Sequence, residues 1–369
     1  MGSKGKVYFP GLNGLRAIAA MAVVLTHIDQ CSYLFGLKSI GFCNSGIASD
    51  GVTLFFVLSG FLITFLLLKE KTVSSSVNVR NFYIRRILRI WPIYYTVIIA
   101  TCLLLGYVPT IGYKKQTLFP AISLFSLMMA NVSYVLYYFT SLAPLWSVGV
   151  EEQFYLFWPL VVNKLKNIPF FLFIFIITYI FLTYGLHIFA NSFWYQIVRL
   201  TSFDCMAFGA FGACLVFYKS KYLRYIYHPV VQVVAIVLVL VPEVYYKFVN
   251  IPRPVRREYF GLLFLVVILN VSTNSRSILI LENKVLDYLG KISYGIYVYH
   301  MLIISILAML LHPYLSVIGL VDFYVLMYVS VVFVTLAISS ISYFYYESRF
   351  LRLKKAYAVV NSSNSRNDQ

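Results

Sequence analysis

Residues 11–30, GLNGLRAIAAMAVVLTHIDQ, form an apolar run that is interrupted by Arg16 and His27. A helix rises 1.5 Å per residue, so about 20 residues cross the roughly 30 Å hydrocarbon layer of a bilayer. Lys4 and Lys6 precede the run, as in a secretory signal. The length of the run, the presence of Arg16 and the lack of a small-residue cleavage pattern instead indicate an uncleaved first membrane span.

The composition extends this interpretation to the whole chain. Of its residues 61% are hydrophobic and only 12% are charged, against about 45–50% and about 25% in soluble domains. We therefore predict an all-α, polytopic membrane protein with about ten transmembrane helices and one extra short or re-entrant helix near 118–138. The predicted spans are 9–30, 51–68, 87–107, 145–162, 170–190, 203–218, 229–246, 259–271, 293–311 and 323–347.

The formal charge of +17 is dispersed among the loops between apolar runs, so we expect no nucleic-acid partner. With ten spans and both termini cytoplasmic, 21 of the 30 lysines and arginines face the cytoplasm and 8 face the other side. An eleventh crossing at 118–138 would reverse the basic loops that follow. In the ten-span arrangement the basic loop 247–257 lies outside and contradicts the positive-inside rule.

The cysteine pattern gives no sign of a metal centre, because the five cysteines show neither a CxxC pair nor the spacing of zinc ligands. They are Cys31, Cys43, Cys102, Cys205 and Cys214. Cys31 and Cys43 fall in one predicted external loop, where a disulfide and two separate thiols are both open alternatives.

Charged side chains inside a bilayer are costly, so Arg16 and His27 are the first candidates for function. They are 11 residues apart, which is about 20° past three full helical turns, so both face the same way about 16 Å apart along the axis. One helix face with a guanidinium and an imidazole suits the lining of a passage across the membrane. Alternatively, Arg16 extends to the inner interface and His27 ends a packed helix.

Arg85, Arg86 and Arg89 begin the third predicted span on its cytoplasmic side. Arg85 and Arg89 share one helix face, with Arg86 beside them. Guanidinium groups bind phosphate with two hydrogen bonds, and coenzyme A carries a pyrophosphate and a 3′-phosphate. The alternative is that these arginines only set the orientation of the span.

Glu151 and Glu152 stand at the start of the fourth predicted span, where packing does not explain two adjacent carboxylates. They either hold the His27 imidazole in one tautomer, pair with an arginine, or complement the helix dipole. A further group of residues is predicted to line the substrate cavity. These residues are Ser59, Trp146, Ser147, Tyr155, Tyr294 and His300. The small residues of the stretch 51–64, which includes Ser59 and Gly60, favour close helix approach instead, and packing is also an alternative for His300.

Read together, six short motifs resemble the acyltransferase-3 family of membrane acyltransferases and occur in that family's order. They are Arg16-x10-His27, Phe55-Phe56-x-Leu58-Ser59-Gly60-Phe61, Arg85-Arg86-x-x-Arg89-x-x-Pro92, Leu145-Trp146-Ser147 with Glu151-Glu152-Gln153-Phe154-Tyr155, Ser293-Tyr294-Gly295-Ile296-Tyr297, and Tyr346-Glu347-Ser348-Arg349-Phe350. The closing motif has Arg349 where the family usually has proline.

The resemblance implies a ten-span domain in a bacterial inner membrane that takes acyl groups, usually acetyl, from cytoplasmic acyl-coenzyme A. It implies a cell-surface carbohydrate, such as a lipopolysaccharide or its lipid-linked precursor, as acceptor. His27 matches the family's essential histidine, Arg16 its paired arginine, and Arg85, Arg86 and Arg89 its cytoplasmic arginine motif. Many relatives carry a C-terminal hydrolase-like domain, whereas only a short tail follows Phe350 here.

We therefore expect residues 1–350 to form the acyltransferase domain and 351–369 a basic cytoplasmic tail. Acetyl-coenzyme A or another acyl-coenzyme A is the expected donor, membrane lipid and a carbohydrate the expected partners, and no metal takes part. His27 acts either as general base or as nucleophile. The alternative function is a transporter or flippase of a sugar or lipid-linked sugar, without acyl chemistry.

Overall fold

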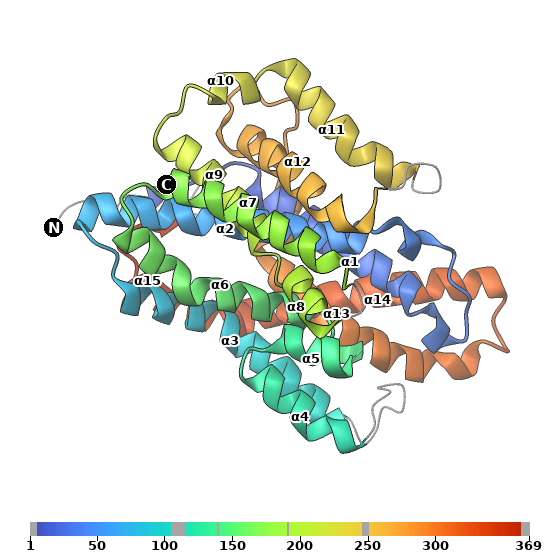
Figure 1. The fold of residues 1–369 in the computed structure, drawn as a ribbon. Coiled ribbons are helices and arrows are strands. Elements are labelled where there is room, and N and C mark those ends of the chain that lie inside the picture. The colour runs from blue at the N-terminus through green and yellow to red at the C-terminus, as the bar shows by residue number, and fades with distance from the viewer. Residues whose placement is uncertain (1–5, 105–114, 139, 190–191, 246–250, 363–369) are drawn as a thin grey trace.

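The computed structural model describes residues 6–104, 115–138, 140–189, 192–245 and 251–362, and nearly all of this chain is helical (Figure 1). The first half comprises α1 (Leu12–Gln30), η1 (Ser32–Phe35), η2 (Phe42–Ser45), α2 (Ile47–Ser74), α3 (Val79–Leu104), α4 (Lys115–Ser126), α5 (Ala130–Tyr137), η3 (Thr140–Leu142) and α6 (Leu145–Lys164). The second half comprises α7 (Ile168–His187), α8 (Phe193–Thr201), α9 (Phe203–Phe217), α10 (Leu223–Ile226), α11 (Pro229–Val244), α12 (Arg253–Thr273), α13 (Lys284–Leu311), η4 (His312–Tyr314), α14 (Leu320–Ser342), the π-helical turn η5 (Tyr343–Glu347) and α15 (Ser348–Ala356).

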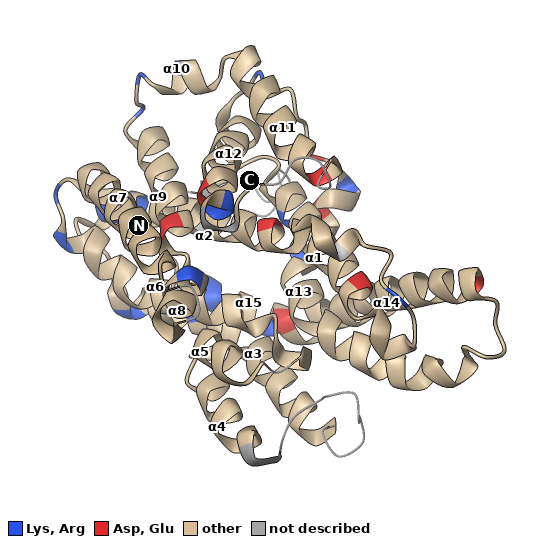
Figure 2. Cartoon of the chain, turned by 45° about the vertical axis from the view of Figure 1, so that its right-hand side comes forward, with Lys and Arg blue, Asp and Glu red and all other residues tan. Residues whose placement is uncertain are grey.

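The outer helices present apolar side chains outwards, as a lipid-facing surface requires. Phe181 of α7, Val230 of α11 and Phe333 of α14 are exposed large hydrophobic residues, and charged residues colour only a small part of the ribbon (Figure 2). Seven helical segments of the described chain are long and apolar enough to cross a membrane. They are Leu12–Gln30, Ile47–Ser74, Val79–Leu104, Ile168–His187, Phe193–Phe217, Lys284–Tyr314 and Leu320–Ala356. The protein is thus an all-helical, multi-pass membrane protein.

The predicted count of ten spans is not confirmed by length and composition. The predicted spans 145–162, 229–246 and 259–271 correspond to α6, α11 and α12, which are helices but are not among the seven. α11 has only 16 residues, and α6 and α12 carry charged residues within their apolar sequences.

The ambiguous segment 118–138 is two short helices, α4 and α5, of 12 and 8 residues. At 1.5 Å per residue they extend about 18 Å and about 12 Å, too short to cross the hydrocarbon layer. The break between them is joined to α6 by Gln153, whose Nε2 donates to the carbonyl oxygen of Met128 at 3.1 Å and to Asn131 Oδ1 at 2.8 Å. Protein contacts therefore satisfy the irregular backbone, as membrane depth requires.

Two close helix pairs form the centre of the fold. In the pair α2 and α9, a Cβ atom on Gly60 would overlap the carbonyl oxygen of Met206, and one on Gly209 would overlap that of Val57. This confirms that the small residues of the 51–64 stretch allow close helix approach. In the pair α1 and α13, Gly290 lies against the backbone of Asn13, while His300 contacts His27. The two helices therefore run in the same direction.

The two ends of the described chain lie on the same side of the molecule. The two-residue strands β1 (Lys6–Val7) and β2 (Asn361–Ser362) pair in parallel. They stand directly before α1 and shortly after α15, so the chain begins and ends its helical part at one face.

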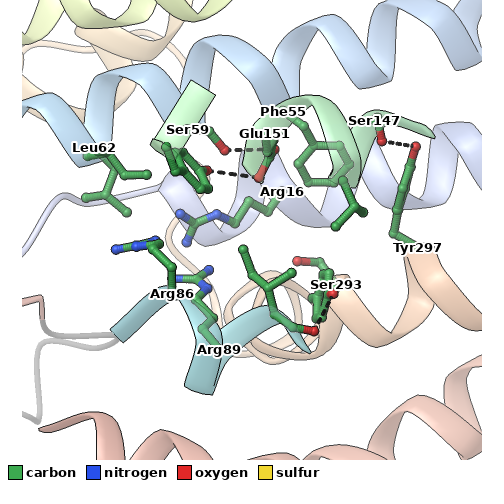
Figure 3. Close-up of a pocket in the computed structure, with 15 residues that line it drawn as sticks. Arg16, Phe55, Ser59, Leu62, Arg86, Arg89, Ser147, Glu151, Ser293 and Tyr297 are labelled. Carbon is green, nitrogen blue, oxygen red and sulfur yellow. Dashed lines mark hydrogen bonds between the residues drawn. The ribbon is translucent and has the colours of Figure 1, made fainter. Parts of the chain in front are cut away.

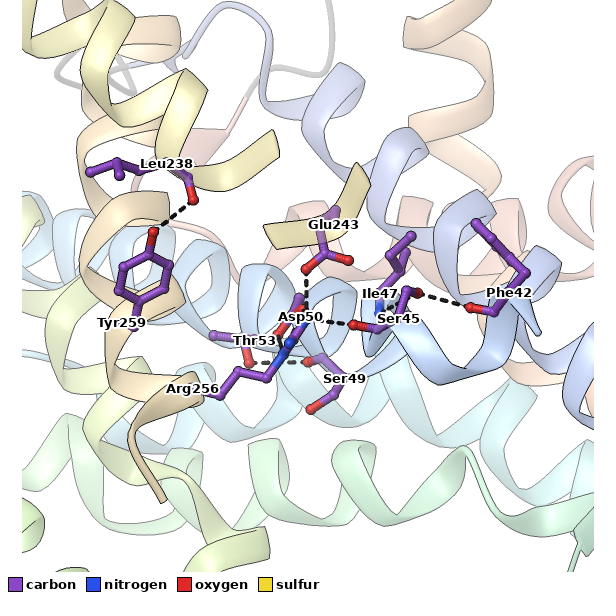
Figure 4. Close-up of polar contacts among 10 residues, drawn as sticks. All are labelled: Phe42, Ser45, Ile47, Ser49, Asp50, Thr53, Leu238, Glu243, Arg256 and Tyr259. Atoms are coloured by element: carbon purple, nitrogen blue, oxygen red, sulfur yellow. Dashed lines mark hydrogen bonds and ion pairs between the residues drawn. The ribbon is translucent and has the colours of Figure 1, made fainter. Parts of the chain in front are cut away.

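The arginine-rich segment that contradicts the positive-inside rule is partly neutralised by ion pairs (Figure 4). Arg256, near the start of α12, forms ion pairs with Asp50 of α2 at 2.5 Å and with Glu243 of α11 at 2.6 Å, and donates to the carbonyl oxygen of Ser45 at 2.8 Å. Arg256 is therefore a structural cation that joins three helices. Whether Cys31 and Cys43 form a disulfide lies outside this description, because the side chain of Cys43 is not among the described residues.

Candidate active site

A pocket lies among α1, α2, α3, α6 and α13, which come from both halves of the sequence (Figure 3). Its lining residues are Arg16, Phe55, Ser59, Leu62, Ile63, Arg86, Arg89, Ile90, Ser147, Val148, Glu151, Tyr155, Ser293, Tyr294 and Tyr297. Eight of the residues predicted to be catalytic, to bind the donor or to line the cavity are on this list, so the fold brings the separate motifs to one place. Those eight are Arg16, Ser59, Arg86, Arg89, Ser147, Glu151, Tyr155 and Tyr294.

One end of the pocket is strongly basic. The guanidinium groups of Arg16, Arg86 and Arg89 converge there (Figure 3), and Glu151 is the only carboxylate among the lining residues. In the described part of the chain none of these three arginines forms an ion pair. Buried charges are costly unless they are paired, so this end of the pocket is suited to an anionic ligand.

Arg86 illustrates this most clearly. Its guanidinium carbon lies 5.5 Å from the ring centroids of both Phe82 and Tyr155, which fix its direction by cation–π contacts. Its Nε is buried and has no hydrogen-bond partner among the described residues. A donor held rigidly and left without an acceptor is ready to bind a phosphate oxygen.

Arg85 has a different environment from its two neighbours. It donates to Glu70 Oε2 of α2 at 2.8 Å and to the carbonyl oxygen of Tyr357, just after α15, at 2.7 Å. It is not among the residues that line the pocket. The arginine motif therefore divides into two pocket residues, Arg86 and Arg89, and one residue that ties α3 to α2 and to the C-terminal segment.

The two adjacent carboxylates of α6 also point to different places. Glu151 Oε1 accepts from Ser59 at 3.0 Å and its Oε2 accepts from Tyr155 at 2.9 Å, so it forms part of the pocket wall. Glu152 accepts from Trp91 Nε1 at 3.0 Å and does not line the pocket. Neither carboxylate has a hydrogen bond to His27 in the described structure.

The other end of the pocket is formed by aromatic residues and hydroxyl groups. The hydroxyls of Ser147 and Tyr297 are hydrogen-bonded at 2.7 Å (Figure 3), and the Tyr297 ring packs edge-on against Phe55 with centroids 5.6 Å apart. The ring of Tyr297 also lies 6.0 Å from that of His300. Tyr297 therefore separates the pocket from a histidine pair on α1 and α13.

His27 lies beyond this end and is not one of the lining residues. Its Nδ1 is 2.9 Å from Nε2 of His300. Arg16 and His27 both face α13, since Arg16 shares the pocket with Ser293 and Tyr294 and His27 contacts His300. The shared helix face that the spacing predicts is thus present, but the passage between the two side chains contains Tyr297.

Among the other predicted residues, Trp146 lies outside the pocket and packs against Phe56 and Tyr134, with centroids 5.9 and 6.1 Å apart. The structure adds residues that the sequence prediction missed. Tyr297 follows Ser293 by four residues and precedes His300 by three, so a helical face through 293, 297 and 300 was visible in the sequence. Lys354 of α15 is a further cation that interacts electrostatically with Arg86 and Arg89. No sequence signal indicated this interaction.

The fold and the pocket define a membrane-embedded protein with a buried, basic pocket and a histidine pair, and the comparisons identify its family. The acyltransferase-3 family model, described as an acyltransferase domain, matches residues 9–343. The chain therefore belongs to the acyltransferase-3 family, which confirms the predicted resemblance. No solved structure matches the chain.

The curated relatives carry names of one kind. A "putative O-acetyltransferase" of Staphylococcus aureus is 37% identical over 164 residues, which are 43% of this chain and 25% of that protein. A "putative peptidoglycan O-acetyltransferase" of Bacillus subtilis is 35% identical over 167 residues, 42% of this chain and 23% of that protein. The peptidoglycan O-acetyltransferase of Listeria monocytogenes is 33% identical over 168 residues, 41% of this chain and 24% of that protein. The match spans about a quarter of each of these relatives.

Proposed function

We propose that this protein is an O-acyltransferase, most specifically an O-acetyltransferase, that moves an acyl group from cytoplasmic acyl-coenzyme A to a hydroxyl of a cell-surface polysaccharide or its lipid-linked precursor. The observation that carries the proposal is the basic end of the pocket, where Arg16, Arg86 and Arg89 lie together without ion-pair partners in the described chain. The O-acetyltransferase names of the relatives support the choice of acyl group.

In this proposal the phosphates of coenzyme A bind Arg86 and Arg89, and the thioester end extends along α1 past Arg16. Guanidinium groups match phosphate oxygens in geometry as well as in charge. To reach His27 the acyl group has to pass Tyr297, so the hydrogen bond between Ser147 and Tyr297 opens when the donor is bound. Arg85, which is held by Glu70, supports α3 and does not bind the donor.

His27 then acts on the acceptor hydroxyl as a general base. Its neutral imidazole takes the hydroxyl proton while the hydroxyl oxygen bonds to the acyl carbon, and the bond between that carbon and the coenzyme A sulfur breaks. The proton passes to the thiolate that leaves, so the products are an ester and free coenzyme A. In the nucleophilic variant the acyl group is first carried on His27, and label then stays on the protein when no acceptor is present.

The same proposal places the protein in a bacterial inner membrane with both termini in the cytoplasm. Pairing of β1 with β2 supports a common side for the two ends, which requires an even number of crossings. Seven candidate segments are an odd number, so one or three of α6, α11 and α12 also cross, and three give the predicted total of ten. The basic pocket end then faces the cytoplasm, where acyl-coenzyme A is found.

Transfer of radiolabel tests the function. The full chain, reconstituted in lipid nanodiscs, is incubated with [14C]acetyl-coenzyme A and either purified peptidoglycan or an inner-membrane fraction that contains lipid-linked sugars. We expect label in an ester of the glycan, and loss of that label with His27→Ala at unchanged protein recovery. Absence of labelled glycan with every acceptor would contradict the proposal and favour a transporter, and full activity of His27→Ala would remove His27 from the mechanism.

A further inference from the structure

We propose that His300 is a positioning residue that holds His27 in the tautomer with a proton on Nδ1 and a free electron pair on Nε2. This inference rests on the proposed function, because it says which nitrogen of His27 takes the proton of the acceptor hydroxyl. His300 itself touches neither substrate in this account. It acts only through His27.

The geometry is a chain of two hydrogen bonds. His300 Nδ1 lies 3.2 Å from the carbonyl oxygen of Ile296, one turn earlier in α13. His300 Nε2 lies 2.9 Å from Nδ1 of His27. The two imidazole rings are nearly parallel, with an interplanar angle of 7° and centroids 5.1 Å apart.

The order of the protons follows from the first bond. A carbonyl oxygen only accepts, so the proton of that bond is on His300 Nδ1. A neutral His300 then has an unprotonated Nε2, which accepts. His27 Nδ1 must therefore donate, and a neutral His27 then has its lone pair on Nε2. The backbone of α13 thus fixes the tautomer of a side chain on α1.

The surroundings of His27 and His300 preserve this hydrogen-bond arrangement. His300 is fully buried, so water does not replace either of its partners. α13 is held close to α1 where Gly290 packs on Asn13, about three turns before His300 and about four turns before His27. His27 is only half-buried, and its Nε2 has no hydrogen bond to another described residue. The free nitrogen is therefore the one on the accessible side of the pair.

The arrangement also fits the reaction. When Nε2 of His27 takes a proton from the acceptor hydroxyl, Nδ1 keeps its proton and the hydrogen bond to His300 persists. That bond becomes charge-assisted and stronger as His27 becomes positive, so His300 stabilises the transient imidazolium. A histidine whose second nitrogen is held by a fixed acceptor is the usual way in which proteins select one tautomer.

The test uses three variants in nanodiscs with the labelled acetyl-coenzyme A assay. His300→Leu removes the acceptor and should lower the transfer rate at saturating donor by about 10-fold to 100-fold, less than the roughly 10²-fold to 10⁴-fold contribution of a general base, because His27 itself is still present. His300→Gln places an amide oxygen near the same position and should recover most of that loss. His312→Leu, at an exposed position, is the matched control and should leave the rate unchanged.

A spectroscopic measurement separates positioning from mere packing. 15N NMR of [15N]histidine-labelled protein, with His27→Gln used to assign the His27 signals, reports which ring nitrogen carries the proton. We expect His27 with protonated Nδ1 and free Nε2 in the wild type and in His300→Gln, and a changed tautomer in His300→Leu. Protonated Nε2 in neutral wild-type His27 overturns the inference, as does full transfer activity of His300→Leu. If the wild-type protein transfers no acyl group, the proposed function is refuted. The NMR measurement then still shows whether His300 fixes the tautomer of His27.

Discussion

Replacement of Arg89 by glutamine and replacement of Arg85 by glutamine should impair different properties of the protein, although the two residues are only four positions apart on one helix. Arg89 lines the pocket and forms no ion pair in the described chain. Arg85 is absent from the lining and is paired with Glu70 at 2.8 Å, the two side chains being 11% and 3% exposed. Arg89→Gln should therefore weaken donor binding, and Arg85→Gln should weaken the fold.

The magnitudes follow from these environments. A hydrogen bond to a charged group contributes about 1.5–3 kcal/mol, and 1.36 kcal/mol corresponds to a factor of ten. Loss of the contact between Arg89 and a phosphate should raise KM for acetyl-coenzyme A by about 10-fold to 150-fold. Removal of one partner of a buried ion pair costs about 3–5 kcal/mol, so Arg85→Gln should lower the free energy of unfolding by an amount near that range. The KM of Arg85→Gln for acetyl-coenzyme A should change by no more than about 3-fold.

Both quantities are measurable on the same preparations. Initial rates of label transfer against acetyl-coenzyme A concentration give KM, and thermal unfolding in one detergent gives the change in stability. Arg224→Gln, on the exposed α10, is the control for loss of a single positive charge. If Arg85→Gln raises KM as much as Arg89→Gln does, the division of the arginine motif into pocket and structural residues is wrong.

Two further substitutions test the packing that supports the site. Gly209→Ala introduces a Cβ that overlaps the carbonyl oxygen of Val57, so α2 and α9 must separate, and a loss of about 1–3 kcal/mol is expected; Gly185→Ala, where a Cβ meets open space, is the control in the same unfolding assay. Arg256→Met leaves the buried carboxylate of Asp50 and the partly buried one of Glu243 without their cation, and we expect the free energy of unfolding to fall by about 3–5 kcal/mol. Asp50→Asn combined with Arg256→Met should restore part of the lost stability. If Arg256→Met alone leaves the stability unchanged, water rather than Arg256 solvates the two carboxylates.

The sequence predicted those features that depend on neighbours along one helix. The spacing of Arg16 and His27 placed both on one helix face, and the structure places both towards α13. The glycine in the Phe55–Phe61 stretch indicated a close helix contact, and Gly60 lies directly against the backbone of Met206. Helical periodicity is sufficient for such predictions, because no distant residue enters them.

Features that depend on the partner helix were not accessible in this way. Periodicity grouped Arg85 with Arg89, whereas Glu70 of α2 and the backbone of Tyr357 hold Arg85 away from the pocket. One of the alternatives for the α6 carboxylates was to hold His27, whereas the structure gives His300, 273 positions away in the sequence, as the partner of His27. A helix face identifies which side chains share a direction, but it does not identify what they meet.

The span count shows the same limit for charged helices. α6 carries Glu151 in the pocket wall and Glu152 in a hydrogen bond to Trp91, and Arg256 of α12 holds three helices together. These functional and structural charges lower the apolar character by which a span is recognised. The helices were therefore predicted correctly, while their crossing of the membrane remains part of the proposal.

A cryo-electron microscopy map of the full chain in nanodiscs with coenzyme A tests the central claim most directly. The account predicts density for the phosphates within hydrogen-bond distance of Arg86 and Arg89, and for the pantetheine arm along α1 towards His27, with the Ser147–Tyr297 contact open. Coenzyme A bound elsewhere, or bound with its phosphates away from Arg86 and Arg89, would contradict the account.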